Sequence, residues 1–583
     1  MPKVVILGGG VAGMSAAHEL IERGFEVEVY DRHKQYPGGK ARSVNVPTVG
    51  PGPEEPLPGE HGFRFFPGFY KHIIDTMERI PFTSKEGDTT RVVDNLVPTE
   101  RVRMAREGKA SITTLVNFPH SFNDLHVLLE SMHANTGLTA EEKKFFATKV
   151  WQLMTSCFDR RANDYERISW WDYLEADRFS DDYRALLVQG LTRTLVAANA
   201  RKASTKTGGD IFLQLIFNMT NPGVHTDRVL NGPTNEVWLH PWFTYLTEKG
   251  VKYVKHHEVT ALQMEKGKIT GATLLNRTTN EPVTVTADYY LLAVPVERAA
   301  PLFTPEMLAI DPTLQGVVNL APSVAWMNGV QYFLTDEVNV VDGHCIYSDS
   351  AWAVTSISQL QFWKHYDIRT KGNGKIRTVF SVDVSDWDTP GSMDCTNGKP
   401  ARDCSHEEIK DEVWHQIKAS LNVNGQKLVQ DETPELWHID GDIKLIPGSG
   451  SREKNEEPLL VNTINSWGLR PDAHTLIPNL FLASDYVRTY TDLATMEGAN
   501  EAARRAVNSI ISVSGSKAKL CEIWNLHEPS ILAPLRNHDQ KRYEKGLPWQ
   551  SYEPWWMKLI LMVLHALKSI WDFFKGLFSK KKS

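Results

Sequence analysis

The stretch KVVILGGGVAGMSAAHELIERGFEVEVYD, residues 3–31, decides the fold. A short apolar run, Lys3–Leu7, leads into the glycine-rich segment Gly8–Gly13. A helical pattern then continues to Arg23, and Phe25–Tyr30 alternates as a strand. Strand, helix and strand in this order predict a βαβ unit, which is typical of an α/β fold.

Each residue of the Gly-x-Gly-x-x-Gly pattern has a mechanical purpose. Gly8 permits a tight turn, Gly10 lets the backbone approach a pyrophosphate, and Gly13 lets helix and strand pack closely. Ala12 lies in the first helical turn, whose N–H groups face the phosphates. Asp31 ends the second strand, where it would accept hydrogen bonds from ribose hydroxyls and disfavour the 2′-phosphate of NADP. The pattern therefore predicts a dinucleotide site.

A second glycine pair follows in Gly38-Gly39-Lys40-Ala41-Arg42-Ser43. It offers another backbone approach to phosphate, at Gly39, together with counter-charge. The segment resembles the Gly-Gly-Arg element of the FAD-dependent amine oxidase and carotenoid desaturase superfamily. Lys40 stands where that superfamily usually has Arg, which would grip phosphate with two parallel hydrogen bonds. Arg42 is the candidate to compensate.

A third element lies near the end of the sequence. Pro478–Asp485 reads as a strand that ends in an acid, and Thr495–Ala503 starts a helix. Together they resemble the C-terminal FAD signature of the same superfamily. That resemblance implies that Asp485 meets the ribityl–pyrophosphate portion and that the Met496 amide points at the flavin pyrimidine edge. It also implies that Val259, on a middle strand, touches adenine.

The resemblance implies a domain organisation. The fold expected is α/β, with a Rossmann-like FAD-binding domain of the glutathione-reductase type and an inserted α+β substrate domain. The FAD-binding domain would comprise residues 1–75, 225–300 and 440–515, and the substrate domain residues 76–224 and 301–439. Because the sequence has no Cys near the C-terminal signature, we expect the FAD to be non-covalent.

Two further segments, Glu60–Tyr70 and Asn231–Pro241, are similar to the phytoene desaturase and hydroxysqualene dehydroxylase branch, which acts on long isoprenoids. The resemblance implies that Glu60–Tyr70, including Gly62, lines the flavin. His61 and Arg64 are candidate catalytic residues; the alternative is a hydrogen-bonded pair that holds the strand. Trp467 could wall the site near the isoalloxazine or belong to the core.

The cofactor implies the chemistry. A substrate C–H would deliver hydride to the flavin, and a neighbouring proton would leave to form an alkene. We therefore expect a desaturase or dehydrogenase. The alternatives are a flavin amine oxidase that uses O2, a redox-neutral flavin-dependent isomerase, and a non-catalytic flavin-binding scaffold.

Composition excludes several other classes. The chain has 583 residues and a net charge of −7, which argues against a nucleic-acid binder. Its hydrophobic fraction of 41% excludes a disordered chain. Five Cys residues are not a disulfide framework and suggest a reduced, intracellular protein. Cys395, Cys404 and His406 lie close in sequence without a second ligand pair, so we expect no metal.

Residues 516–583 form a tail that ends in an apolar helical pattern at 555–578. The polar residues of this pattern fall on one helical stripe: Lys558, His565, Lys568, Asp572 and Lys575. With Lys580–Lys582 behind it, the pattern predicts an amphipathic helix in an anionic membrane surface. The alternative is a helix docked on the protein or on a second copy in a homo-oligomer. The membrane reading implies a peripheral protein of the cytoplasmic face, a lipid or isoprenoid substrate and a quinone electron acceptor.

Overall fold

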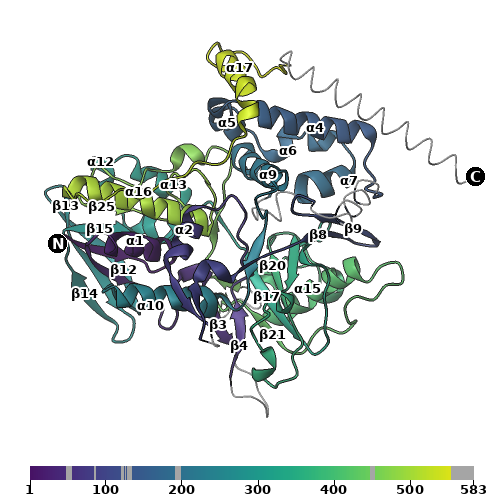
Figure 1. The fold of residues 1–583 in the computed structure, drawn as a ribbon, viewed down its shortest axis with the longest axis horizontal. Coiled ribbons are helices and arrows are strands. Elements are labelled where there is room, and N and C mark those ends of the chain that lie inside the picture. The colour runs from purple at the N-terminus through teal and green to yellow at the C-terminus, as the bar shows by residue number, and fades with distance from the viewer. Residues whose placement is uncertain are drawn as a thin grey trace, which may run out of the picture.

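The computed structural model describes residues 1–46, 55–84, 87–119, 134–190, 199–446 and 453–552, with residues 124, 127 and 131. Figure 1 shows three regions of the chain: a parallel sheet with its helices, a larger sheet with α15, and a helical region that carries α17. The expected tail helix, residues 555–578, lies outside the described residues.

The first sheet is parallel and confirms the predicted βαβ unit. It has five strands in the order β11 (Lys252–Val254), β2 (Glu26–Tyr30), β1 (Lys3–Leu7), β15 (Tyr289–Leu292) and β25 (Leu480–Leu482). Ile6 in the central strand pairs with Val29 on one side and Leu291 on the other. Because these strands come from distant parts of the chain, their carboxyl ends bring distant loops together at one edge.

Helices and a small sheet complete this region. The helices are α1 (Val11–Ile21), α2 (His72–Arg79), α10 (His240–Glu248) and α16 (Met496–Ser514). The small sheet is antiparallel, with strands β12 (His257–Glu265), β13 (Lys268–Asn276) and β14 (Glu281–Val285). Val259 lies in β12 and is half-buried.

The larger sheet has seven strands. Their order is β21 (Trp437–Ile439), β17 (Asn328–Leu334), β20 (Thr378–Val384), β19 (Val354–Ser358), β18 (Gly343–Tyr347), β8 (Arg101–Arg106) and β9 (Lys109–Leu115). One face packs on α15 (His406–Leu421) through Val382, Val384 and Trp414. At the β17–β20 part of the sheet, the other face meets the hairpin of β3 (Ser43–Val46) and β4 (Leu57–Glu60), where Leu57 packs near Val379.

The helical region is built around Trp170 and Leu213. Its helices are α4 (Ala140–Thr155), α5 (Phe158–Asn163), α6 (Trp170–Tyr173), α9 (Thr205–Met219) and α17 (Ala533–Tyr543). A capping box between Thr139 and Glu142 starts α4. Within the described ranges, none of the helices is both long and apolar enough to cross a membrane.

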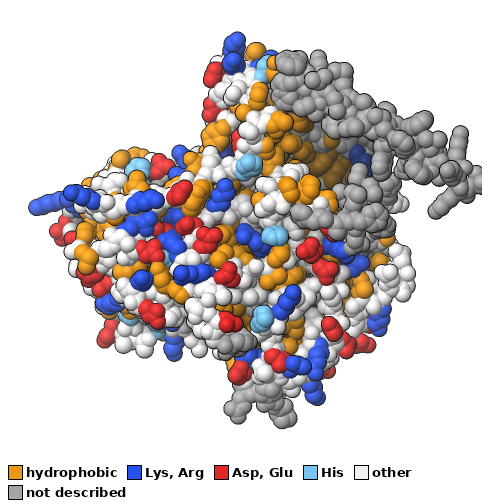
Figure 2. Space-filling model, in the orientation of Figure 1, with side chains coloured by type: hydrophobic (Ala, Val, Ile, Leu, Met, Phe, Trp, Pro, Cys, Tyr) orange, Lys and Arg blue, Asp and Glu red, His pale blue; other side chains and the backbone are white. Residues whose placement is uncertain are grey.

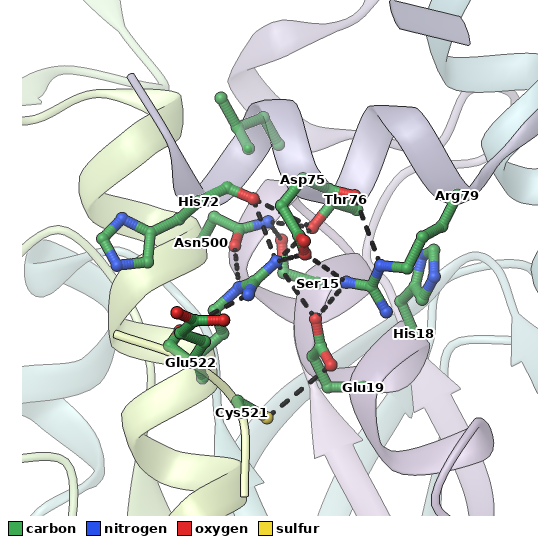
Figure 3. A network of polar contacts seen from close by, with 12 residues as sticks. Ser15, His18, Glu19, His72, Asp75, Thr76, Arg79, Asn500, Cys521 and Glu522 are labelled. Carbon is green, nitrogen blue, oxygen red and sulfur yellow. Dashed lines mark hydrogen bonds and ion pairs between the residues drawn. The ribbon is translucent and has the colours of Figure 1, made fainter. Parts of the chain in front are cut away.

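A buried polar network fixes α16 against α1 and α2 (Figure 3). Arg504 on α16 pairs with Asp75 of α2 and lies 3.2 Å from a Glu19 carboxylate oxygen of α1. The Asn500 amide donates to the Ser15 hydroxyl at 2.8 Å. Because α1 and α16 both begin at the same edge of the parallel sheet, the network sets the relative position of their N-termini.

Candidate cofactor and active site

Of the three glycines in the Gly-x-Gly-x-x-Gly pattern, Gly8 and Gly13 have no room for a side chain, whereas Gly10 has open space in front of it. A Cβ on Gly8 would lie 2.5 Å from the Ala293 carbonyl oxygen, and one on Gly13 would lie 1.9 Å from the Gly8 oxygen. A Cβ on Gly10 would meet nothing closer than the Gly39 Cα at 3.8 Å. No side chain caps the N-terminus of α1, so its first N–H groups are available to an anion.

The second glycine pair closes on the first loop. The Gly38 N–H donates to the Gly9 carbonyl at 3.1 Å, and a Cβ on Gly39 would lie 3.0 Å from the Gly10 Cα. Gly38 and Gly39 both have positive φ, at 97° and 55°, which favours glycine. The two loops form a cradle of backbone in front of Gly10, whose open space and free N–H groups fit a pyrophosphate.

Asp31 is held at this cradle by the loop itself. One of its carboxylate oxygens accepts the Gly9 N–H at 2.7 Å, and the other accepts the His33 N–H at 2.7 Å. The side chain therefore stands at the end of β2, where the sequence places a ribose acceptor, and it also supports the turn.

The basic residues of the second motif, Lys40 and Arg42, contact protein groups in this structure. The Arg42 guanidinium lies 2.8 Å from an Asp442 oxygen and 3.0 Å from a Glu457 oxygen, and these carboxylates raise its pKa. Arg42 therefore neutralises two buried acids. It does not take the phosphate-binding role that arginine has in the family motif. The Lys40 ammonium donates to the Pro458 carbonyl and lies 3.7 Å from Glu297.

The opposite side of the site comes from the end of the parallel sheet. Asp485 follows β25, and Met496 is the first residue of α16, whose N-cap Thr495 accepts the Gly498 N–H at 3.0 Å. Glu297 is nearby: both of its carboxylate oxygens are buried without a hydrogen bond, and burial raises its pKa. Buried acceptors without donors fit the ribityl hydroxyls of FAD, which are donors.

His61 and Arg64 each have partners, but not one another, and the Arg64 Nε is buried without an acceptor. The His61 Nδ1 lies 2.8 Å from an Asp440 oxygen. Arg64 donates to the Lys40 carbonyl at 2.8 Å and to the Gly62 carbonyl at 3.0 Å. Both side chains therefore hold the 60–64 segment in place. Arg64 attaches it to the second glycine loop, and His61 attaches it to the loop after β21.

Trp467 lies where the helical region meets the parallel-sheet region. Its ring is 4.0 Å from the Lys206 ammonium, and its backbone N–H donates to Glu166 at 2.7 Å. Lys206 is buried and pairs with Asp492 at 3.1 Å, shortly before α16. Lys206 and Asp492 were not predicted from the sequence, because neither belongs to a recognisable motif.

Asp383 is a third residue that sequence reasoning missed. It lies on β20 with 7% of its surface exposed, and burial raises its pKa to about 7. A Cβ on Gly62 would come within 2.5 Å of one of its carboxylate oxygens. Its only sequence signal is an acid within an alternating apolar strand. Cys395 and Cys404, considered above, are free thiols.

The comparisons with known proteins identify the family. Residues 11–511 match the family described as flavin containing amine oxidoreductase. A zeta-carotene desaturase of Synechocystis sp. is 26% identical over 305 residues, which is 50% of this chain and 58% of the relative. A carotenoid phi-ring synthase of Chlorobaculum tepidum is 41% identical over 69 residues, 12% of this chain and 10% of the relative.

Solved structures show the same fold. An oxidoreductase from Methanosarcina mazei superposes with a TM-score of 0.55 at 14% identity, covering 88% of this chain and all of the other. The family match spans most of the chain. In addition, the geometry of the two glycine loops fits FAD, the cofactor of this family. The protein therefore belongs to the flavin containing amine oxidoreductase family and is an FAD-dependent oxidoreductase.

Proposed function

We propose that the protein is an FAD-dependent desaturase that removes two hydrogens from a long isoprenoid at a membrane surface. Two carotenoid enzymes are among its relatives, although the chain spans little more than half the length of the zeta-carotene desaturase. The observation that carries the proposal is an apolar row of side chains on the larger sheet, which begins beside Gly62.

The apolar row consists of Ile346, Met104 and Ile112, and Thr355 lies between it and Asp383. Strand register places these residues side by side across β19, β18, β8 and β9, and Thr355 pairs with Asp383. They lie on the face opposite α15, because Val382 and Val384 occupy the α15 face and side chains alternate along a strand. A long hydrocarbon fits a strip of this kind better than a small charged amine does.

The helical region adds further apolar surface. Phe146, Trp151 and Phe212 are only partly buried there, and Figure 2 shows hydrophobic side chains around a hollow over α4 and α6. Exposed apolar surface of this kind favours a lipid or a membrane as partner.

FAD, when bound, supplies a two-electron acceptor. The residues of this chain do the rest. The two glycine loops hold the diphosphate, the 60–64 segment lies between the second glycine loop and the larger sheet, and the apolar row positions the hydrocarbon and excludes water. A membrane quinone is the electron acceptor that we propose for reoxidation.

The test of this function is anaerobic reduction of the bound flavin. Holoenzyme is mixed with zeta-carotene or squalene in detergent micelles, and in parallel with putrescine or L-tryptophan. We expect the isoprenoids to bleach the visible flavin band and the amines to leave it unchanged. Reduction by the amines alone, with hydrogen peroxide formed when air is admitted, would establish the amine oxidase alternative.

We expect the FAD to be released intact by acid. The five cysteines are free thiols, and none of them belongs to the cofactor site described above. Trichloroacetic acid should precipitate the protein and leave yellow FAD in the supernatant. Flavin that stays with the pellet after washing would show a covalent bond.

We also expect deletion of residues 555–583 to release the protein from anionic liposomes while FAD stays bound. Each large apolar side chain buried in the interface contributes about 1.5–3 kcal/mol, whereas each Lys near anionic lipid contributes about 1 kcal/mol. Flotation with liposomes is the measurement. In a matched variant, Lys580, Lys581 and Lys582 are changed to Gln. A smaller fraction of this variant should float with the liposomes, but part of it should still bind. Unchanged flotation of the truncated chain would favour the docked-helix alternative.

A further inference from the structure

Asp383 occupies a central position on the larger sheet. Its strand, β20, pairs with β17 and β19, so that Gly329 and Thr355 are its neighbours on either side. A Cβ added to Gly329 would lie 2.6 Å from the Gly62 nitrogen, which shows how closely the 60–64 segment covers this part of the sheet. The Asp383 carboxylate therefore faces the segment that lies against the second glycine loop.

Asp383 differs from the other acids around it in having no partner. Asp440 accepts the Asn328 amide and lies 2.8 Å from the His61 Nδ1, and Asp442 pairs with Arg42. Among the described residues, none forms a hydrogen bond or an ion pair with the Asp383 carboxylate. A buried acid without a hydrogen-bond donor costs stability, so packing alone does not account for Asp383.

The charged and titratable groups that face Asp383 come from three elements. Arg64 and His61 belong to the 60–64 segment, His344 to β18, and Asp440 to the segment after β21. Arg64 and the two histidines favour the ionised carboxylate, whereas Asp440 opposes it. Burial outweighs them and raises the pKa of Asp383 to about 7. A base whose pKa lies near the working pH combines a large ionised fraction with a useful affinity for the proton.

The carboxylate also stands at the end of the apolar row. From Asp383 the strand register leads through Thr355 to Ile346 and Met104 of the row, so a hydrocarbon lying along it would end beside the Asp383 carboxylate. A proton acceptor is what desaturation needs at that point.

We propose that Asp383 is the base that takes the proton in the desaturation, an inference that rests on the proposed function. At one substrate carbon the C–H electron pair leaves with its hydrogen as hydride to FAD, the oxidant. At the adjacent carbon the Asp383 carboxylate takes the hydrogen as a proton, and the electrons of that bond form the C=C bond. The substrate loses two electrons, FAD gains them, and Asp383 becomes the neutral acid until solvent takes its proton.

The first test compares Asp383→Asn with the wild type in anaerobic reduction by zeta-carotene. Asparagine keeps the size of the side chain but cannot accept the proton. We expect the rate to fall by about 10²–10⁴-fold. The wild-type rate should rise with pH through about 7, because the base must be ionised, and this rise should be absent in the variant. The control Asp388→Asn removes an exposed acid that pairs with Arg402, and its rate should be unchanged.

The second test does not depend on turnover. In the apoprotein, infrared spectra should show the carbonyl band of a protonated carboxylic acid that disappears as pH rises through about 7. Because burial also raises the pKa of Glu297, the readout is a difference spectrum. The wild-type minus Asp383→Asn difference should contain the component that titrates near pH 7, and the wild-type minus Asp388→Asn difference should not. A component of unchanged size in Asp383→Asn would overturn the assignment of this titration to Asp383.

The outcomes separate the inference from the proposed function. If zeta-carotene reduces the wild type and Asp383→Asn at the same rate with the same pH profile, the base role is wrong and the desaturase proposal stands. If zeta-carotene and squalene both fail to reduce the wild type, the desaturase proposal is wrong and the base role falls with it. A slow variant with normal FAD content and no pH dependence supports both.

Discussion

Gly10→Val should yield a folded protein that contains no flavin. The structure leaves open space in front of this residue, because an added Cβ would find no atom closer than the Gly39 Cα at 3.8 Å. We expect the pyrophosphate to occupy this space between the two glycine loops, so the valine side chain would exclude the phosphates without displacing protein atoms. The ratio of flavin to protein after purification should fall to near zero, while circular dichroism should match the apoprotein.

Two matched variants separate cofactor loss from misfolding. Gly223→Val, in a loop far from the site in sequence, also has room for a Cβ and should keep its flavin. Gly13→Val should disrupt the loop itself, because its Cβ would lie 1.9 Å from the Gly8 carbonyl oxygen. Full flavin occupancy in folded Gly10→Val would mean that the loop does not hold the phosphates.

Arg504→Met should lower the stability of the parallel-sheet region by about 3–5 kcal/mol, because removal of one partner leaves buried charges uncompensated. Arg504 is 2% exposed, pairs with Asp75 and Glu19, and donates to the Asn500 side chain at 2.8 Å. The temperature at which flavin fluorescence appears on heating reports this loss, since the network fixes the N-termini of α1 and α16.

An exposed ion pair provides the control for this prediction. The Lys109 side chain is 53% exposed and pairs with Asp182, which is 32% exposed. Lys109→Met should cost no more than about 1 kcal/mol, as is typical of ion pairs near the surface. Equal losses in the two variants would show that the network in Figure 3 does not hold the helices in place.

Local patterns in the sequence were sufficient to predict the parallel-sheet region. The apolar run at Lys3–Leu7 and the alternation before Asp31 correspond to β1 and β2, and the helix after Thr495 corresponds to α16. These elements are specified by short-range periodicity and by glycines whose spacing follows from the turn geometry.

Side-chain partners could not be predicted in the same way. Arg42 was expected to contact phosphate, but its partners Asp442 and Glu457 are 400 and 415 residues away in the chain. Asp383 approaches Gly62 only because β17 and β20 pair beneath the 60–64 segment. No local pattern encodes such contacts, since they depend on the order of strands in the larger sheet.

The most direct test of the desaturase proposal is mass spectrometry of the substrate after a single turnover. Holoenzyme and zeta-carotene are incubated without oxygen at equal concentrations, and the lipid is extracted. We predict that the recovered carotenoid lacks two hydrogens, in an amount equal to the flavin reduced. Recovery of unchanged or merely isomerised carotenoid with oxidised flavin would contradict the proposal.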